Sequence, residues 1–348
     1  MLKNVGIIGF GSYLPFSRIK ISEIASVWRK EEKVIEDSLG ITEKTVASLD
    51  EDTVTMGVEA GRNALLMAKI DPGEISAIYV GSESHPYAVN PSSTIIGEAL
   101  GMGTNYLAAD LEFACKAATA GMQALAGLLE TGLINYGLVI GADAAQAKPH
   151  DILEYTAASG AVAFILGNKK QDFLVEILDF TSFSSDTPDF WRRDGIPYPS
   201  HQGRFSGEPA YFAHVQGAAQ GLLSKTKMKP ADFNYCVFHM PNGKFPCEVG
   251  KRLGFDKKQL EPGLIVSQIG NPYSASSILG LCAVLEAAKP GELIFLTSYG
   301  SGAGADSFIL KTSKLLPKKR KLVPGFKSFL EKKNYISYPD YLKFTGRI

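Results

Sequence analysis

Cys115 is the residue whose type and position point most directly to covalent chemistry. It stands where a predicted strand gives way to a helix rich in small residues, in the sequence LEFACKAATAGM. A thiol at the start of a helix meets the positive end of the helix dipole and free N–H groups, which lower its pKa and favour the thiolate. Lys116 adds a nearby positive charge. The alternative is a buried, small apolar side chain, which is the usual situation of a free cysteine.

Two further polar side chains stand at ends of predicted elements. His239 ends an apolar strand in the sequence YCVFHMPNGK, and Asn271 directly precedes a second helix rich in small residues. Open α/β sheets bind ligands at the carboxyl ends of their strands. A thiol, an imidazole and an amide at three such ends therefore indicate thiolate chemistry with an imidazole partner. The alternatives are a structural histidine and an asparagine that only caps its helix.

Glu83 follows another predicted strand, in the sequence GSESHP, and is a candidate general base. Burial disfavours the ionised carboxylate, so a partly buried glutamate has a raised pKa and accepts protons near neutral pH. A solvated loop glutamate is the alternative. We expect His85, two residues further on, to support this turn rather than to react.

Two glycine-rich turns have different predicted uses. The sequence GFGSYL at residues 9–14 begins like a dinucleotide-binding fingerprint, but Leu14 occupies the third glycine position and Pro15 prevents a helix from starting there. The turn at residues 300–304, GSGAG, instead joins two predicted strands. We expect it to bring backbone N–H groups close to a reacting oxygen.

The elements that must position these residues alternate between short Val-, Ile- and Leu-rich runs and longer helical patterns, which predicts α/β layering. Predicted strands cover residues 4–9, 75–81, 105–110, 136–142, 161–167, 233–239, 264–267, 292–299 and 306–311. Predicted helices cover residues 21–38, 53–69, 92–100, 115–131, 208–226, 242–253 and 274–288.

Two stretches of the chain echo each other. Residues 115–143 and 274–301 each combine a helix rich in Ala, Gly and Ser with a turn and an apolar strand. Small residues permit close backbone approach, so we expect two central helices in a chain of two similar halves; two unrelated units are the alternative. Residues 182–207 are aromatic, polar and aperiodic, as functional loops often are. We expect them at the mouth of a pocket between the halves.

Composition narrows the class of protein. The chain has 348 residues with 36 basic and 36 acidic side chains, and this zero net charge lacks the electrostatic signature of a nucleic-acid-binding protein. No apolar run approaches the roughly 20 residues that span a bilayer. The four scattered cysteines argue against a disulfide scaffold and a metal site and suit a reducing compartment. We expect a cytoplasmic protein in which Cys236, Cys247 and Cys282 have no chemical role.

Charge is unevenly distributed along the chain. Residues 311–348 hold 11 Lys and Arg but two acidic residues, and the run KKRK at 318–321 lies between two prolines. We expect residues 313–348 to form a basic extension. It is either a solvated tail or a docking arm for an acidic partner surface or a phosphate-bearing ligand.

Five segments in chain order resemble hydroxymethylglutaryl-CoA synthases of the compact archaeal type, within the thiolase superfamily. They are GSESHPYAV from residue 81, EFACKA from 112, DTPDFWRR from 186, His239 with PNGKFP from 241, and YGSGAG from 299. The resemblance runs from the first strand to about residue 310. It implies an α/β, five-layered αβαβα thiolase-like fold with two duplicated halves, at 1–167 and 168–312, and an active site between them.

The resemblance also implies a reaction, a Claisen-type condensation in the mevalonate pathway of isoprenoid synthesis that needs no cofactor or metal. Cys115 takes the acetyl group of acetyl-CoA, Glu83 removes a proton from its methyl group, and His239 hydrogen-bonds the ketone of acetoacetyl-CoA and supplies positive character or a proton. Water then releases 3-hydroxy-3-methylglutaryl-CoA. The backbone N–H of Cys115 and the turn at 300–304 are the expected oxyanion hole. The implied substrate-binding residues are Asn271, Ser301, Thr156 and Ser206, and the implied CoA contacts are Arg204 and Lys244.

Two positions depart from the family pattern, and two alternative functions stay open. Glu248 stands where a basic residue is common, which puts one phosphate contact in doubt, and Ser206 replaces a frequent threonine. A type-III β-ketoacyl synthase also uses Cys, His and Asn but has no matching catalytic glutamate, while a degradative thiolase would carry a cysteine within residues 298–305. A non-catalytic scaffold subunit of a thiolase complex, using its basic extension to bind partners, is the alternative from another class.

Partners are implied by the resemblance alone. Family members of this type are expected to be homodimers and to associate with an acetoacetyl-CoA thiolase and a small OB-fold scaffold protein. Such a complex would pass acetoacetyl-CoA directly from one enzyme to the next. We expect no nucleic acid and no membrane among the partners.

Overall fold

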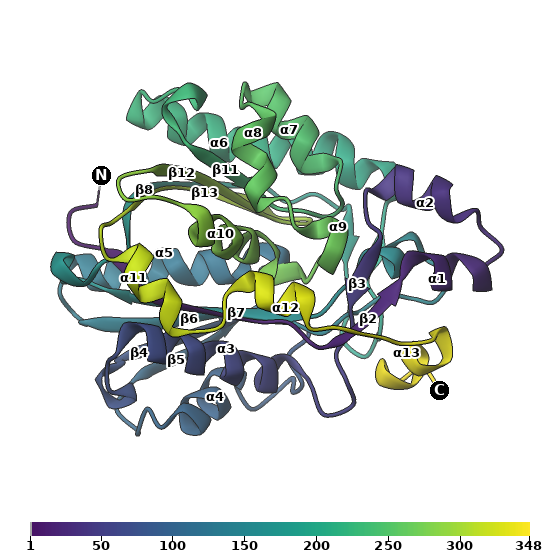
Figure 1. Cartoon of the computed structure of the whole chain (residues 1–348), viewed down its shortest axis with the longest axis horizontal. Helices are drawn as coiled ribbons and strands as arrows, with labels where there is room; N and C mark the ends of the chain where they lie inside the picture. The colour runs from purple at the N-terminus through teal and green to yellow at the C-terminus, as the bar shows by residue number, and fades with distance from the viewer. Residues whose placement is uncertain (1) are drawn as a thin grey trace.

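The computed structural model describes residues 2–348, except for the side chains of Arg204 and Phe205. Its elements lie in five layers (Figure 1). One outer layer holds α6 (Phe212–Thr226), α7 (Phe245–Leu253) and α8 (Lys257–Leu260), and the other holds α3 (Thr53–Ala68) and α4 (Ser92–Leu100). Between the two sheets lie α5 (Ala117–Glu130) and α10 (Ser276–Ala287). This is the expected αβαβα order.

Within residues 2–348, nine strands are hydrogen-bonded in the order β11-β12-β13-β8-β1-β7-β6-β4-β5. The two sheet layers meet where Gly6 and Ile7 pair with Glu176 and Val175. The strands are β1 (Gly6–Tyr13), β4 (Ala77–Gly81), β5 (Leu107–Leu111), β6 (Tyr136–Asp143), β7 (Gly160–Gly167), β8 (Val175–Ser184), β11 (Tyr235–Phe238), β12 (Leu293–Gly300) and β13 (Gly304–Thr312).

The two sheet layers repeat one topology. Strand β4 pairs in parallel with β6, and β7 lies antiparallel between β6 and β1. Likewise β11 pairs in parallel with β12, and β13 lies antiparallel between β12 and β8. Helices α5 and α10 precede the equivalent strands β6 and β12, which explains the sequence echo. The boundaries proposed at residues 167 and 312 stay predictions.

Two predicted elements were wrong, and one strand of the main sheet was missed. The strand predicted at 264–267 is instead the end of a turn followed by the short helix α9 (Val266–Ile269), because a short apolar run has no periodicity that separates strand from helix. The helix predicted at 21–38 is two helices, α1 (Ile21–Val27) and α2 (Glu32–Leu39), interrupted where Arg29 has a positive φ of 53°. Strand β8 was not predicted at all.

Small residues bring the catalytic segments together across the central layer. A Cβ added at Gly81, the last residue of β4, would lie 2.4 Å from the backbone nitrogen of Ala118 in α5. A Cβ at Gly300 would lie 2.6 Å from the carbonyl oxygen of Phe113. Only glycine permits these approaches. The loop after β4 and the turn after β12 therefore both pack against the turn that carries Cys115.

The basic extension is a folded part of the molecule, so its interpretation as a solvated tail was wrong. It forms α11 (Leu316–Lys319), α12 (Phe326–Glu331), β14 (Asn334–Tyr335) and α13 (Tyr338–Phe344), drawn in yellow across the front of the molecule (Figure 1). Strand β14 pairs with β2 (Ser17–Lys20), which also pairs with β3 (Glu43–Thr45). Apolar side chains of the extension, including Leu316 and Phe326, are buried in the main core.

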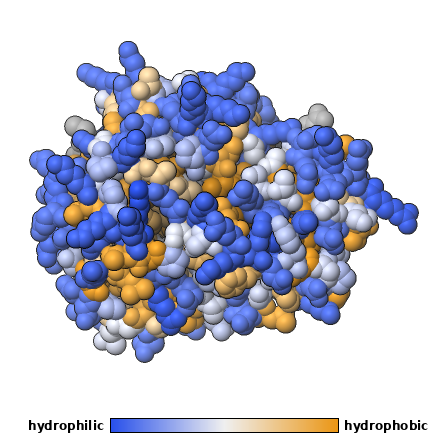
Figure 2. Space-filling view, in the orientation of Figure 1, coloured by the Kyte–Doolittle hydropathy of each residue, from blue (hydrophilic) through white to orange (hydrophobic). Residues whose placement is uncertain are grey.

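Two cations of the KKRK run bind the carbonyl ends of helices in the body of the molecule. The Lys319 ammonium donates to the carbonyl oxygens of Met67 and Ala68 at the end of α3. The Arg320 guanidinium donates to the carbonyls of Leu285 and Ala288 at the end of α10. Positive groups stabilise the negative, carbonyl-rich ends of helices. The face that carries the extension is mostly hydrophilic with scattered apolar groups (Figure 2). No helix described within residues 2–348 is long and apolar enough to cross a membrane.

Candidate active site

Cys115 lies in a tight 3₁₀ turn, Ala114–Lys116, between β5 and α5. The residue before it, Ala114, has a φ of 44°, a left-handed conformation that is sparsely populated by residues other than glycine and often marks functional sites. The Cys115 side chain is only 3% exposed. Its Sγ donates a hydrogen bond to Glu83 Oε1 at 3.1 Å. The structure thus places the candidate nucleophile in direct contact with the candidate base.

The expected low pKa of Cys115 is wrong. Burial raises the pKa of the Cys115 thiol well above its ordinary value, and the neighbouring Glu83 carboxylate raises it further by repulsion. Lys116 does not compensate, because its ammonium is buried and paired with both carboxylate oxygens of Asp306 at 2.9 and 3.0 Å. In this arrangement the thiol keeps its proton and shares it with Glu83.

Glu83 is held in place by a second carboxylate that the sequence analysis missed. Asp143, the last residue of β6, is fully buried. Its Oδ1 accepts hydrogen bonds from the backbone N–H of Glu83 at 2.8 Å and from the hydroxyls of Ser82 and Ser84 at 2.8 and 2.7 Å. Its Oδ2 accepts from the backbone N–H of Ser274 at 2.8 Å, at the start of the α10 region. One side chain therefore joins the glutamate loop to the second central helix.

The environment of Glu83 fits a general base. Burial raises the pKa of the Glu83 carboxyl to about 8, and the negative charge of Asp143 is the second cause. A carboxyl with this pKa is partly ionised at neutral pH, and its ionised form is a stronger base than an ordinary carboxylate. His85 does not face this chemistry: its Nδ1 lies 2.8 Å from the Ser92 hydroxyl and 3.4 Å from Asp110, so it supports the turn as expected.

His239 and Cys115 line the same cavity, which has a volume of about 360 Å³. Its backbone N–H donates to Thr297 O, and its carbonyl accepts from the Tyr211 hydroxyl, each at 2.8 Å. Burial lowers the pKa of His239 to about 3, so its imidazole is neutral at neutral pH. The expectation that it supplies positive character or a proton as the alkoxide forms stays a prediction. A neutral imidazole still donates a hydrogen bond.

The other polar residues predicted for the substrate line the same cavity. Thr156, Asn271, Ser206 and Ser301 all belong to its wall. The Asn271 Oδ1 accepts from the backbone N–H of Tyr273 at 3.0 Å, so this side chain both caps a turn and faces the cavity. The cap and the site residue, which the sequence presented as alternatives, are compatible.

Of the two residues predicted to contact CoA, the structure describes the side chain of one. Lys244 is exposed at the N-terminus of α7, two residues from Asn242, which lines the cavity. The side chain of Arg204 lies outside the part of the chain that the structure describes. Glu248, which departs from the family pattern, is paired with Arg252 at 2.9 Å on the surface of α7.

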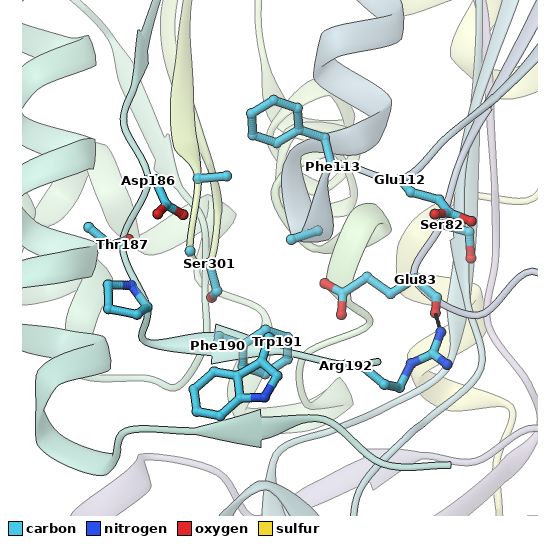
Figure 3. Close-up of a pocket in the computed structure, with 14 residues that line it drawn as sticks. Ser82, Glu83, Glu112, Phe113, Asp186, Thr187, Phe190, Trp191, Arg192 and Ser301 are labelled. Carbon is cyan, nitrogen blue, oxygen red and sulfur yellow. Dashed lines mark hydrogen bonds between the residues drawn. The ribbon is translucent and has the colours of Figure 1, made fainter. Parts of the chain in front are cut away.

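A second, wider cleft of about 610 Å³ is lined by Glu83 but not by Cys115 (Figure 3). Glu83, Glu112 and Trp191 are among the residues that line it. Figure 3 shows the Glu83 carboxylate pointing into this cleft, with the Arg192 guanidinium bonded to the Glu83 carbonyl oxygen at 2.9 Å. Phe190 and Ser301 line both cavities. Residues of the 182–207 segment thus contribute walls to both.

Among the residues of this site that were not predicted are Asp143, Arg192 and Tyr273. Asp143 offered a signal, since it is a carboxylate at the carboxyl end of the apolar strand YGLVIGAD. Arg192 lies within the segment DTPDFWRR but carried no assigned role. Tyr273, whose hydroxyl donates to Gln146 O at 2.8 Å, is visible only in three dimensions. Among the side chains described, no cluster of three or more His, Cys, Asp or Glu is placed to hold a metal ion.

Relatives at about half identity cover nearly the whole chain. It is 54% identical over 343 residues to "Hydroxymethylglutaryl-CoA synthase" of Methanocaldococcus jannaschii, with 99% of each chain covered. It is 51% identical over 343 residues to the protein of the same description from Methanothermobacter thermautotrophicus, again with 99% of each covered.

More distant comparisons concern the fold. Residues 223–312 match a family profile described as "3-Oxoacyl-[acyl-carrier-protein (ACP)] synthase III C terminal". The solved structure "MvaS in complex with 3-hydroxy-3-methylglutaryl coenzyme A" superposes with a TM-score of 0.89 at 23% identity, covering 99% of this chain and 92% of that chain. The 3-oxoacyl-(acyl carrier protein) synthase III, FabH, from Pseudomonas aeruginosa PAO1 gives 0.82 at 20% identity, covering 90% and 99%. The fold is therefore thiolase-like.

Proposed function

Because this chain belongs to the hydroxymethylglutaryl-CoA synthase family, we propose that it condenses acetyl-CoA with acetoacetyl-CoA and water to give 3-hydroxy-3-methylglutaryl-CoA and CoA. The observation that carries the proposal is the 3.1 Å contact between Cys115 Sγ and Glu83 Oε1, beside a cavity that Cys115 shares with His239. A nucleophile, a base and a hydrogen-bond donor are the three groups that this reaction needs. The proposed place of the reaction is the mevalonate pathway.

In the first step, Cys115 attacks the acetyl carbonyl of acetyl-CoA. The carbon–sulfur bond to Cys115 forms as the bond between the acetyl carbon and the CoA sulfur breaks. The proton of the Cys115 thiol ends on the sulfur of the departing CoA, which leaves as a thiol, so this step does not require Glu83 as its base. Backbone N–H groups at Cys115 and in the turn at 300–304 are the proposed oxyanion hole, where one donor is typically worth about 3 kcal/mol in the transition state.

In the second step, the ionised Glu83 takes a proton from the methyl group of acetyl-Cys115. The resulting carbanion attacks the ketone carbon of acetoacetyl-CoA, which forms the new carbon–carbon bond. As negative charge develops on the ketone oxygen, the neutral His239 donates a hydrogen bond to it. The proton that Glu83 took from the methyl group then completes the hydroxyl, which leaves Glu83 ionised again. The raised pKa of Glu83 supports this assignment, because a stronger base removes a weakly acidic methyl proton more effectively.

In the third step, water hydrolyses the thioester to Cys115 and releases the product. Asn271, Thr156, Ser206 and Ser301 are proposed to orient the acyl groups, which their shared position on the cavity wall supports. Lys244 and Arg204 are proposed to contact the phosphates of CoA. No cofactor or metal is required in this scheme.

The partners stay proposals. We propose a homodimer that associates with an acetoacetyl-CoA thiolase and an OB-fold scaffold protein in the cytoplasm. The thiolase condensation that forms acetoacetyl-CoA is unfavourable. Consumption of acetoacetyl-CoA by this protein would shift that equilibrium toward condensation. Co-purification of the three proteins tests the complex, and an isolated dimer at cellular concentrations would count against it.

The proposed reaction is tested by product analysis with the purified protein. Acetyl-CoA and acetoacetyl-CoA together should give 3-hydroxy-3-methylglutaryl-CoA, identified by mass spectrometry. Malonyl thioesters should not support condensation. Decarboxylative condensation of malonyl thioesters, with no product from acetoacetyl-CoA, would assign the chain to a β-ketoacyl synthase reaction instead.

A further inference from the structure

A buried cluster of polar side chains lies directly behind one wall of the cavity that Cys115 and His239 line. The wall is formed by Ile152, Leu153 and Thr156, in and just after the 3₁₀ turn Ile152–Tyr155. Between them, Glu154 turns away from the cavity and is fully buried. The reaction steps proposed above make no use of this carboxylate.

Glu154 receives hydrogen bonds from three separate parts of the chain. Its Oε1 accepts from the Tyr338 hydroxyl of α13 at 2.8 Å. Its Oε2 accepts from the Trp28 indole N–H at the end of α1, and from the backbone N–H of His150, both at 2.8 Å. The residue therefore connects the cavity wall with α1 and with the helix of the basic extension.

A buried lysine strengthens the same connection. Lys44 of β3 is fully buried, and its ammonium donates to the carbonyl oxygen of Glu154 and, at 3.2 Å, to the Tyr341 hydroxyl of α13. The ammonium also lies 4.6 Å from the centre of the Tyr341 ring. Helix α13 thus contacts the side chain of Glu154 directly through Tyr338, and it reaches the backbone of the turn through Lys44.

The same turn also supports the hairpin at the cavity mouth. Asp151, which caps the turn, lies 3.0 Å from the Nε2 of His201 in strand β10 (Ser200–His201). Strand β10 pairs with β9 (Phe190–Trp191), and Phe190 lines both cavities. The Arg347 guanidinium, just beyond α13, lies 4.3 Å from the ring of Tyr198. The wall is therefore held between α13 behind it and the hairpin in front.

The cluster around Glu154 contributes more to the specific geometry of the segments that it joins than to the free energy of unfolding. Burying a carboxylate and an ammonium carries a large desolvation penalty, so apolar side chains of similar volume would often stabilise a core equally well. A polar network whose members are all satisfied is directional, and it rigidifies the segments that it joins. The cluster accordingly restricts how the wall can move.

We propose that Glu154 is a positioning residue for substrate binding, through which α13 sets the position of the wall Ile152–Thr156 against the acyl and pantetheine chain of a CoA thioester. The identity of this ligand rests on the proposed function. The role is distinct from chemistry, since Glu154 faces away from the cavity and does not touch the reacting groups. It also gives the basic extension a function that its charge did not suggest.

The experiment compares two tyrosines of the extension that make the same kind of bond. Tyr338→Phe removes one hydroxyl that donates to Glu154. Tyr335→Phe removes one hydroxyl that donates to Glu43 at 2.6 Å, away from the cavity wall. We expect the KM for acetoacetyl-CoA to rise about fivefold in Tyr338→Phe, with kcat changed less than about twofold, because binding geometry is lost while the reacting groups stay in place. Tyr335→Phe should keep both values.

A second variant and a second readout keep the test decisive. Glu154→Gln retains the shape but loses one acceptor and the charge, and it should raise KM further; if it does not fold, Tyr338→Phe alone decides. Unchanged KM in Tyr338→Phe, or a loss of kcat at constant KM, would overturn the positioning role. If the unmodified protein forms no product, the proposed function fails instead. Calorimetric titration with CoA then still reports whether Tyr338→Phe weakens binding and Tyr335→Phe does not.

Discussion

Replacing Glu83 by glutamine should separate the two halves of the reaction. The substitution keeps the size of the side chain but removes the charge beside the Cys115 sulfur. Glu83 raises the pKa of Cys115 both by repulsion and by accepting its hydrogen bond. Without that charge, the thiolate forms more easily, so acetylation of Cys115 should persist. Condensation should be lost, because no base remains to remove the methyl proton.

The magnitude of this effect follows from the geometry. Two unit charges separated by the 3.1 Å between Sγ and Oε1 repel by on the order of 5 kcal/mol at an effective dielectric constant near 20. Because one pKa unit corresponds to 1.36 kcal/mol, removing even a third of this repulsion should lower the pKa of Cys115 by more than about one unit. Loss of a general base typically slows its step by about 10²–10⁴-fold.

The assay measures both half-reactions in one preparation. Rapid quenching after acetyl-CoA addition gives the rate of acetyl-Cys115 formation, and product analysis after acetoacetyl-CoA addition gives condensation. Glu112→Gln is the matched control, since Glu112 lines the same wide cleft but does not touch Cys115. Loss of acetylation together with condensation in Glu83→Gln would refute the reasoning, as would full condensation.

Three more outcomes follow from the same contacts. His239→Ala should impair condensation more than acetylation, and NMR titration should find the His239 ring neutral between about pH 5 and 8, since burial lowers its pKa to about 3. Asp143→Asn removes a charge that raises the pKa of Glu83, so the acid limb of the condensation rate should move to lower pH, while the lost hydrogen bond costs about 1.5–3 kcal/mol of unfolding free energy. Lys116→Met leaves Asp306 buried and unpaired and should cost about 3–5 kcal/mol in denaturant unfolding; Lys116→Met with Asp306→Leu should recover part of that loss. The first prediction would be contradicted by a His239 ring that titrates near pH 6.5, and the second by an acid limb that does not move. The third would be contradicted if Lys116→Met and the double variant were equally stable.

The positions of the reactive residues were predictable because they follow a local rule. Glu83, Cys115 and His239 all stand just beyond the carboxyl ends of apolar strands, and strands of one sheet layer bring such ends to one edge. The echo between 115–143 and 274–301 was readable for a similar reason, since small residues at helical spacing mark a helix packed against its neighbours. Both signals depend on a few adjacent residues.

The ionisation states were not predictable, because they depend on residues far apart in the chain. The sequence offers Lys116 next to Cys115, but the fold turns that lysine toward Asp306, which is 190 residues away, and leaves the thiol beside Glu83. Asp143 and Ser274 meet in the same way, from opposite halves. Local charge is a poor guide to pKa wherever burial decides which neighbours count.

The basic extension shows the same difference between what adjacent residues indicate and what contacts between distant residues decide. Its composition, with Lys and Arg in excess and weak periodicity, is typical of a solvated segment. The structure instead buries Phe326 and Tyr341 and uses Lys319 and Arg320 to cap two helices of the body. Each of these contacts joins residues that no local pattern connects.

The central claim is that Cys115 carries the acetyl group as an intermediate. Mass spectrometry of peptides from the wild-type protein, quenched after incubation with acetyl-CoA, tests it most directly. The acetyl group should appear on the peptide that contains Cys115, and should disappear when acetoacetyl-CoA is added, at the rate at which 3-hydroxy-3-methylglutaryl-CoA forms. Product formation with no acetyl group on Cys115, or an acetyl group that acetoacetyl-CoA does not discharge, would contradict the account.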